Sequence, residues 1–460
     1  MPKKPTSSRP ASSSRPQKPS RFAGAPGLLA RHLAAEAIGA VTEDWRALDE
    51  SLDQVLERAE ASEFEERDRG LVRAIAMAGI RHFGTIRKAL LARLKSGMPS
   101  PSGSLAPVLV GGAAQILYLD VPDHAAVDLS IRLLQIDGRT QRYTGLANAV
   151  LRRIAREKEQ ILAAADPLAD DTPDWLRERW VGHYGEAEAR AIAAAHGTEP
   201  GLDLTVKADP ERWAVDLDAL LLPTGSLRLR QRAPLPSLPG YTDGAWWVQD
   251  AAAALPARLL APRPGERIAD LCAAPGGKTA QLAAAGAQVL AVDRAPSRMR
   301  RLTQNMARLH LQVETRVADA LTLEDTGFDA VLVDAPCSAT GTIRRHPDVA
   351  WTKTPDDVER LAALQRRLLG RAAAMVRPGG RIVYCTCSLE PEEGERQMAA
   401  FLDREAGFAR LPVTAAELPG LTEAITPEGD VRTRPSMLAS DEPRLAGLDG
   451  FFIGRLVRQA

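Results

Sequence analysis

The stretch "DLCAAPGGKT", residues 270–279, connects the end of one expected strand to the start of an expected helix. Its two glycines, Gly276 and Gly277, allow the backbone to approach a ligand closely before a helix begins near Thr279. A strand, a glycine-rich turn and a helix in this order are typical of a parallel α/β sheet. The stretch therefore predicts a ligand site at the end of a strand.

The sequence from about Asp243 onward repeats this alternation of strands and helices. The pieces "ERIADL", "AQVLAVD", "DAVLVDAP" and "GGRIVYCTCS" read as strands with helical segments between them. This order predicts a mainly parallel sheet with helices on both faces. In such sheets, ligands bind outside the carboxyl ends of the strands.

Two carboxylates occupy positions that suit a nucleoside cofactor at this edge. Asp293 closes the next expected strand, where a carboxylate can hold the ribose hydroxyls. Asp319, in "VADAL", follows the third expected strand and is placed to accept a hydrogen bond from an adenine amino group. A phosphate-binding P-loop is the competing interpretation of "CAAPGGKT", with "VLVD" ending at Asp334 as a magnesium-binding strand. That motif requires glycine where Cys272 stands.

The four cysteines of the chain are sparse, and two of them follow strand ends. Cys337 lies in "DAPCSATGTIRRHPD", residues 334–348, and Cys387 lies in "YCTCSLEPEE", residues 384–393. A free cysteine is more often a small buried hydrophobe than a nucleophile. However, two thiols at the ligand-binding edge of one sheet, beside a cofactor site, favour covalent catalysis over packing.

Composition indicates a folded, multidomain protein. The chain has 460 residues, 45% of them hydrophobic and 26% charged, which predicts roughly three domains. Its 59 basic residues balance its 59 acidic residues, so any surface for nucleic acid must be local. The most apolar run, "LAPVLVGGAAQILYL" from Leu105, is shorter than the ~20 residues of a membrane span. We expect no membrane contact, and the absence of an apolar signal region argues for the cytoplasm.

Three regions precede the α/β part. Residues 1–22 are rich in Ser, Pro, Lys and Arg, which predicts a disordered basic tail. Residues 23–165 predict an all-α domain, and residues 166–240 predict a small α+β connector. The helical period appears in steps of four residues, namely Ile86, Leu90 and Leu94, and Leu146, Val150 and Ile154.

The connector contains alternating arginines. In a strand, Arg228, Arg230 and Arg232 would lie on one face, which is either a solvated face or a face that contacts RNA.

The motifs together resemble those of one family. "DLCAAPGGKT", "DAPCSATGTIRRHPD", "YCTCSLEPEEGE", "WWVQDAAAALPARLL" and "GFFIGRL" occur in the order found in the RNA 5-methylcytosine methyltransferases of the RsmB/NOP (Fmu/Sun) family. The resemblance is close over residues 240–460. The helical region, with "GLANAVLRRI", is similar to the NusB-type RNA-binding domain that precedes the catalytic domain in this family. The resemblance therefore implies a Rossmann-like class I methyltransferase domain at residues 241–460.

The resemblance also implies a reaction and its residues. S-adenosylmethionine would be the cofactor, the substrate would be a cytosine in RNA, expected to be small-subunit ribosomal RNA, and no DNA is expected. Cys387 would be the nucleophile, Cys337 would help to release the product, and Asp334 would contact both the cytosine edge and the cofactor. Cys385 lies outside the family pattern and is expected to be a structural strand residue. The residues implied in cofactor binding are Cys272, Ala273, Ala274, Pro275, Gly276, Gly277, Lys278, Asp293, Asp319 and Asp334.

Two other classes of protein remain as alternatives. A non-catalytic RNA-binding or ribosome-assembly factor would keep the domains without the chemistry. A zinc module would use the four cysteines as ligands, but their spacing is not a usual zinc pattern, so we expect no metal site. Arg344, Arg345 and His346 are candidates to hold RNA phosphates, whereas Arg366, Arg367 and Arg371 more simply form a solvated helix face.

Overall fold

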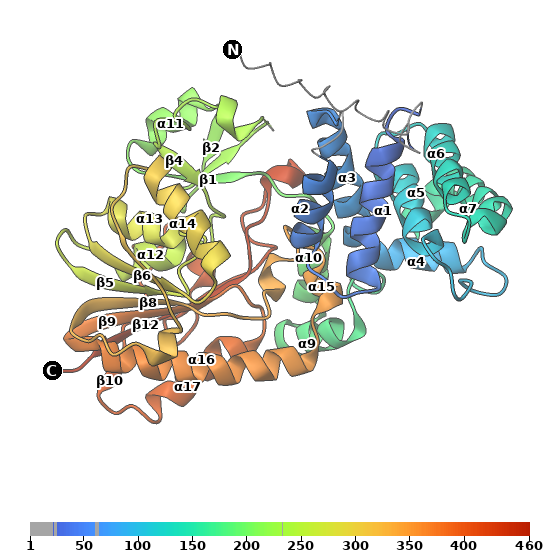
Figure 1. The fold of residues 1–460 in the computed structure, drawn as a ribbon. Coiled ribbons are helices and arrows are strands. Elements are labelled where there is room, and N and C mark those ends of the chain that lie inside the picture. Colours follow the sequence, from blue (N-terminus) through green and yellow to red (C-terminus); the bar gives the residue numbers. More distant parts are fainter. Residues whose placement is uncertain (1–21, 23–24, 60–63, 232) are drawn as a thin grey trace, which may run out of the picture.

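The computed structural model describes residues 22, 25–59, 64–231 and 233–460. The predicted basic tail, residues 1–22, lies outside the described residues except for Phe22, and Arg232 lies outside them as well. Figure 1 shows a helical domain at one end, a small connector sheet, and a domain built on a large sheet at the other end.

The helical domain is all-α, as predicted. Its buried apolar side chains form one core, in which Ile86, Leu90 and Leu94 are buried. The second step of four, Leu146, Val150 and Ile154, lies in one helix as predicted; Val150 and Ile154 are buried in the core, whereas Leu146 is 37% exposed. The helices of this domain are α1 (Leu28–Thr42), α2 (Leu48–Ala59), α3 (Glu66–Arg81), α4 (Phe83–Leu91), α5 (Leu105–Tyr118), α6 (Asp123–Ile136), α7 (Thr144–Arg156) and α8 (Lys158–Ala163).

The described part of the connector combines three α-helices with a small antiparallel sheet. The sheet order is β2-β3-β1-β4, and its last strand extends past the predicted boundary at residue 240. One face of the sheet covers a small core that contains Leu204, Leu227 and Trp246. The connector elements are α9 (Asp174–Tyr184), α10 (Glu186–His196), β1 (Asp203–Val206), α11 (Pro210–Asp216), β2 (Ala219–Leu221), β3 (Leu227–Leu229) and β4 (Trp246–Val248).

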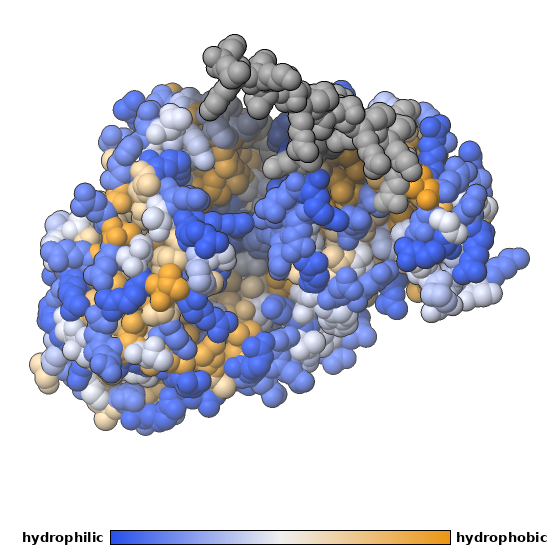
Figure 2. All heavy atoms as spheres, in the orientation of Figure 1, coloured by the Kyte–Doolittle hydropathy of each residue, from blue (hydrophilic) through white to orange (hydrophobic). Residues whose placement is uncertain are grey.

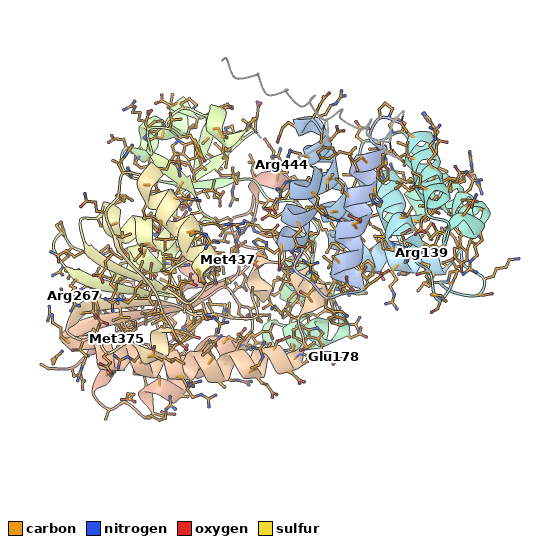
Figure 3. All side chains as sticks on the ribbon, viewed as in Figure 1. Arg139, Glu178, Arg267, Met375, Met437 and Arg444 are labelled. Carbon is orange, nitrogen blue, oxygen red and sulfur yellow. The ribbon has the colours of Figure 1, made fainter. Side chains whose placement is uncertain are left out.

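Of the alternating arginines, Arg230 is exposed, as a solvated face predicts, but Arg228 is not. Arg228, on β3, is fully buried and donates to both carboxylate oxygens of Asp203, at 2.6 and 2.7 Å. It also donates to the carbonyls of Leu445 and Gly447. Figure 3 shows the neighbouring Arg444 between the connector sheet and α2. Arg228 therefore anchors the C-terminal segment to the connector, and it forms neither a solvated face nor an RNA surface.

The large sheet confirms the predicted α/β class. Its order is β10-β12-β9-β8-β5-β6-β7, and β11 pairs with β12. The pairs from β7 to β9 are parallel, whereas β12 runs antiparallel to β9. The strands are β5 (Arg267–Leu271), β6 (Gln288–Asp293), β7 (Glu314–Val317), β8 (Phe328–Asp334), β9 (Val376–Thr386), β10 (Phe408–Arg410), β11 (Val431–Thr433) and β12 (Phe451–Arg458).

Helices cover both faces of this sheet (Figure 1). Successive residues of a strand point to opposite faces, so Leu332 packs with α12 while Val331 and Val333 pack with α16. Burial on both faces explains the continuous apolar run of β8, which is typical of a parallel strand. The helices are α12 (Leu255–Leu260), α13 (Gly277–Ala284), α14 (Pro296–Arg308), α15 (Val349–Thr352), α16 (Pro355–Met375) and α17 (Glu395–Leu402).

The helical domain is joined to the large-sheet domain through α15 and the residues before it. The indole nitrogen of Trp351 donates to the carbonyl of Ile80 at 3.0 Å, and its ring meets Phe83 edge to face. The backbone N–H of Leu48, at the start of α2, donates to Asp348 at 3.2 Å. No helix in the described part of the chain is both long and apolar enough to cross a membrane.

The buried ion pair in the connector gives a test of the fold. Asp203→Asn removes the charge that balances fully buried Arg228, so the free energy of unfolding should fall by about 3–5 kcal/mol. Chemical denaturation followed by tryptophan fluorescence measures this change. The matched control is Asp218→Asn, because Asp218 pairs with Arg230 on the surface, where loss of a pair changes stability by at most about 1 kcal/mol. Equal effects of the two substitutions would contradict the assignment of Arg228 as an anchor.

Candidate active site

The parallel pairing of β8 and β9 brings two cysteines together. The strands are in register with Asp334 opposite Cys385, and both chains then leave the sheet in the same direction. Cys337 and Cys387 follow within a few residues, and their Sγ atoms lie 3.4 Å apart. Cys385 is a fully buried strand residue, as expected, and its thiol donates to Oδ1 of Asp334 at 3.4 Å.

Asp334 lies between these thiols and the glycine-rich turn. Its Oδ2 accepts a hydrogen bond of 2.8 Å from Nζ of Lys278, which is the first lysine of α13. Burial is the largest single effect on Lys278 and opposes its charge, but the carboxylate of Asp334 together with the nearby Cys385 and Cys387 raises the pKa of the lysine overall. The ion pair fixes both side chains at the edge of the sheet.

The turn between β5 and α13 has a backbone that favours a close ligand approach. Gly276 has a φ of 102°, and Cys272 has a φ of 63°, a value that few residues other than glycine adopt. Beneath the turn, the hydroxyl of Thr279 donates to Asp270 at 2.6 Å. Burial raises the pKa of Asp270 to about 7 and that of Cys272 to about 12.

A cavity of about 550 Å³ opens at this edge of the sheet. Trp247, Gln249, Arg345 and Phe451 contribute to its wall, and they were not assigned to the cofactor site from the sequence. The sequence motifs could have indicated three of them, because Trp247 and Gln249 lie in "WWVQD" and Phe451 lies in "GFF". The predicted site residues that line the cavity are Ala273, Ala274, Pro275, Gly276, Gly277, Lys278, Asp334 and Cys387.

Two predicted cofactor carboxylates lie behind or beside this cavity and do not line it. Asp293 is buried, and its two oxygens accept hydrogen bonds from the backbone N–H groups of Ala274 and Ala295. Asp319 is exposed and caps the short helix that follows it by accepting from the N–H of Leu321. In this structure Asp293 thus fixes the glycine-rich turn.

The two cysteine loops share a buried polar network that the sequence did not reveal. Glu393 is fully buried and accepts from the backbone and hydroxyl of Ser338 and from Gln365. Glu390, also fully buried, pairs with Arg179 of α9. Burial raises the pKa of Glu393, although its hydrogen bonds oppose this rise. The network holds both loops in place from beneath.

The segment predicted to hold phosphates forms a different set of contacts. Arg344 is buried and donates to Asp250 at 2.8 Å and to Asp449 at 3.2 Å, so it is structural and the prediction for it was wrong. Arg345 also pairs with Asp449, yet its guanidinium lines the cavity. The sequence could not reveal these ion pairs, because the two carboxylates, Asp250 and Asp449, lie far from the arginines along the chain.

His346 connects the cavity to the helical domain. Its Nδ1 lies 3.0 Å from Asp49 of α2, and Arg81 of α3 donates to the carbonyl of Arg344 at 2.8 Å. On the face shown in Figure 2, the surface is hollowed between the helical domain and the large-sheet domain. The helical domain therefore supports the wall of the cavity directly.

The two touching thiols differ in their surroundings. The hydrogen bond with Cys387 and burial raise the pKa of the Cys337 thiol well above its ordinary value, so Cys337 keeps its proton. Cys387 faces the cavity together with Arg345 and Lys278. Across the described ranges, no three His, Cys, Asp or Glu side chains converge as metal ligands would.

Comparisons with known proteins agree with this arrangement. Residues 257–457 match the model of the family described as 16S rRNA methyltransferase RsmB/F, and residues 28–156 match the NusB family. A ribosomal RNA small subunit methyltransferase B from Cronobacter sakazakii is 31% identical over 450 residues, covering 93% of this chain and 98% of the relative. The protein of the same name from Klebsiella pneumoniae is 32% identical over the same shares.

Among solved structures, the crystal structure of PH0851 has the same fold. Its TM-score is 0.71 at 23% identity, and the match covers 94% of this chain and 98% of that one. The similarity thus spans the helical domain, the connector and the large sheet together. The chain belongs to the 16S rRNA methyltransferase RsmB/F family, with a NusB-family domain preceding its methyltransferase domain.

Proposed function

We propose that this protein transfers a methyl group from S-adenosylmethionine to carbon 5 of a cytosine in small-subunit ribosomal RNA, with Cys387 as a covalent nucleophile. The observation that carries the proposal is the 3.4 Å contact between the thiols of Cys387 and Cys337 beside the glycine-rich turn. The relatives named ribosomal RNA small subunit methyltransferase B support the substrate class. A non-catalytic assembly factor would have no use for two touching thiols at a cofactor cavity.

The glycine-rich turn suits a nucleoside cofactor. A Cβ atom on Gly276 would lie 2.8 Å from Cγ of Leu302, so only glycine fits there. The cavity of about 550 Å³ also lies within the usual range for small-molecule sites. When bound, S-adenosylmethionine supplies an electrophilic methyl group. The residues that would hold it are those from Cys272 to Lys278 together with Asp334, with Asp293 acting through the turn that it fixes; Asp319, implied by the family resemblance, lies outside the cavity wall and would need the ligand to extend beyond it.

The chemistry of cytosine explains the need for a thiolate. Carbon 5 is a poor nucleophile until a group adds at carbon 6, and addition of the Cys387 thiolate creates an enamine-like intermediate that is nucleophilic at carbon 5. A thiolate forms most readily beside positive charge. Arg345 and Lys278 line the same cavity as Cys387 and supply this charge.

Asp334 is placed to bind the edge of the cytosine. Lys278 and Cys385 each donate to one oxygen of its carboxylate, which fixes its orientation. A hydrogen bond from the base to this carboxylate would stabilise protonation at the ring nitrogen while the thiolate adds. The cytosine must leave its stack to reach this position, which is easier in a loop or distorted stem.

Adduct formation would change the role of Cys337. The hydrogen bond with Cys387 and the negative charge on its thiolate both raise the pKa of Cys337 in the free enzyme. Both effects disappear once the sulfur of Cys387 is bound to carbon 6, so the pKa of Cys337 falls during the reaction. Once Cys337 has released its own proton to solvent, its thiolate would accept the proton from carbon 5, the bond between carbon 6 and the sulfur of Cys387 would break, and the aromatic ring would be restored.

The first test concerns the product and the nucleophile. Unmodified small-subunit ribosomal RNA incubated with the protein and S-adenosylmethionine should gain 5-methylcytidine, measured by nucleoside mass spectrometry. Cys387→Ala should lower the rate by at least about a thousandfold, because no other group adds to carbon 6. Cofactor binding by this variant, measured by calorimetry, should persist. Product formation by Cys387→Ala would contradict covalent catalysis by that residue.

The second test concerns the release of the product. Cys337→Ala should leave the addition step intact but remove the proton acceptor, so a covalent complex of RNA and protein should accumulate. It would appear as a slow band on a denaturing gel, and it should be absent from the double variant that also carries Cys387→Ala. Rapid product formation without this band would exclude a role for Cys337 in release.

The third test concerns the charge beside Cys387. Arg345→Gln should slow alkylation of Cys387 by iodoacetamide at neutral pH by about tenfold, equivalent to about 1.4 kcal/mol of lost thiolate stabilisation. Mass mapping of the alkylated peptide gives the rate, and the surface variant Arg404→Gln is the control. An unchanged rate in a variant with an unchanged melting temperature would remove Arg345 from the mechanism.

A further inference from the structure

A second groove, of about 450 Å³, lies between the connector sheet and the helices α12 and α13. Its charged lining residues are Lys207 and Arg258, and no carboxylate of the described residues lines it. This one-sided charge is unusual in a chain with 59 basic and 59 acidic residues, in which most buried arginines pair with carboxylates. The described residues that line the groove thus carry positive charge only.

Arg258 has no protein partner in this groove. It is the charged residue of α12, whose other side chains are buried in the core beneath the sheet. Within the part of the chain that the structure describes, no hydrogen bond or ion pair joins its guanidinium to another residue. Arg258 itself is exposed, so its guanidinium is open to a ligand, although the protein around it removes part of its water and lowers its pKa.

The opposite wall of the groove adds hydroxyl groups. Thr205 on β1 and Trp247 on β4 are paired residues, so their side chains share the face of the sheet that looks toward α12. The hydroxyl of Thr205 is buried and has no hydrogen-bond partner among the described residues. Ser226 and Thr224 lie nearby in the wall. A hydroxyl and a guanidinium that both lack partners fit an anion with several acceptor oxygens.

The turn beside Arg258 keeps this space open. Gly225 has a φ of 78°, and a Cβ atom there would lie 3.1 Å from Nη1 of Arg258. Any larger residue would press on the guanidinium and would also strain the backbone. Lys207 lines the groove, and its ammonium group donates to the carbonyl of Leu309, a residue that lines the catalytic cavity.

The groove and the catalytic cavity are close neighbours. Trp247 lines both of them, and Gln249 of the cavity donates to Gln281 of the groove at 2.9 Å. Helix α13 also links them, because Gly277 lines the cavity and Gln281 and Ala284 line the groove. At 1.5 Å per residue, the two sites are separated by roughly 10 Å along this helix. An RNA strand with one base in the cavity can reach the groove with its adjacent backbone.

We propose that this groove binds a phosphodiester of the RNA substrate through Arg258, Lys207 and the hydroxyl of Thr205, next to the nucleotide that undergoes reaction. Arginine matches phosphate oxygens with a fork of donors, and phosphate contacts position a nucleic acid without reading its sequence. The site thus sets the register of the strand over the cavity. This inference rests on the proposed function for the identity of the ligand as RNA.

The experiment measures RNA binding as a function of salt for the full-length protein. A fluorescently labelled transcript of small-subunit ribosomal RNA is titrated at several salt concentrations, with fluorescence anisotropy as the readout. Loss of one phosphate contact should reduce the slope of log K against log salt by about 0.7–0.9. We expect Arg258→Gln to show this reduction with several-fold weaker binding, and Arg258→Lys to retain most of the slope.

The matched control is Arg366→Gln, which should leave the slope unchanged. Arg366 is an exposed arginine of α16, on the opposite face of the sheet from α12. Melting temperatures of all variants establish that they are folded. A slope for Arg258→Gln equal to that of the wild type would overturn the inference.

A second arm separates RNA from free phosphate. Inorganic phosphate is added to the wild type and to Arg258→Gln, and thermal melting is compared with sodium chloride at equal ionic strength. Stabilisation by phosphate that requires Arg258, with no change in the RNA slope, would assign the groove to a small anion and overturn the RNA assignment.

Methylation is assayed in parallel, so that the two proposals can fail separately. An altered RNA slope without any 5-methylcytidine would refute the proposed reaction and support the groove. Methylation by the wild type with an unaltered slope for Arg258→Gln would support the proposed reaction and refute the phosphate site in the groove.

Discussion

The structure of the site depends on the parallel register between β8 and β9. Because Asp334 pairs with Cys385, the two chains leave the sheet side by side, and Cys337 meets Cys387. Side chains alternate along a strand, so Cys385 and Cys387 share one face while Tyr384 packs on the other. A slip of one residue would exchange these faces and turn Cys387 toward α16. The buried apolar residues on both faces of the sheet prevent such a slip.

The strand register does not hold the two loops that follow β8 and β9. These loops are held by hydrogen bonds and ion pairs to buried carboxylates. Glu390 and Glu393 are fully buried, and burial of a carboxylate is costly unless it is paired or hydrogen-bonded. Arg179, from α9 of the connector, pairs with Glu390, and Trp180 donates to the same carboxylate. The loop that carries the proposed nucleophile is therefore completed by a residue from an earlier domain.

The opposite wall of the cavity is also held in place by an earlier domain. Arg345 lies on a segment whose neighbours contact the helical domain, through Asp348 with Leu48 and through His346 with Asp49. The helical domain, which matches the NusB family, consequently has a structural role in the site as well as any role in RNA binding.

The sequence was sufficient for features that depend on neighbouring residues. Alternation of strands and helices predicted the sheet, and strand ends located Cys337, Cys387 and Asp334. The sequence was insufficient where the ion-pair partner of a charged residue lies far away along the chain. Arg228 seemed to belong to a polar face because its buried partner, Asp203, lies on another strand. Arg344 seemed free for the same reason, since Asp250 and Asp449 come from distant segments.

The four cysteines show how position in the fold assigns chemistry that the residue type leaves open. Cys385 is buried in the strand, and burial raises its pKa well above the ordinary value. Burial also raises the pKa of Cys272 to about 12, where its left-handed backbone serves the turn. Cys337 is kept protonated by Cys387. Among these thiols, Cys387 lines the cavity with Arg345 and Lys278. Its place in the cavity beside two basic residues thus distinguishes Cys387, the proposed nucleophile, from three chemically identical side chains.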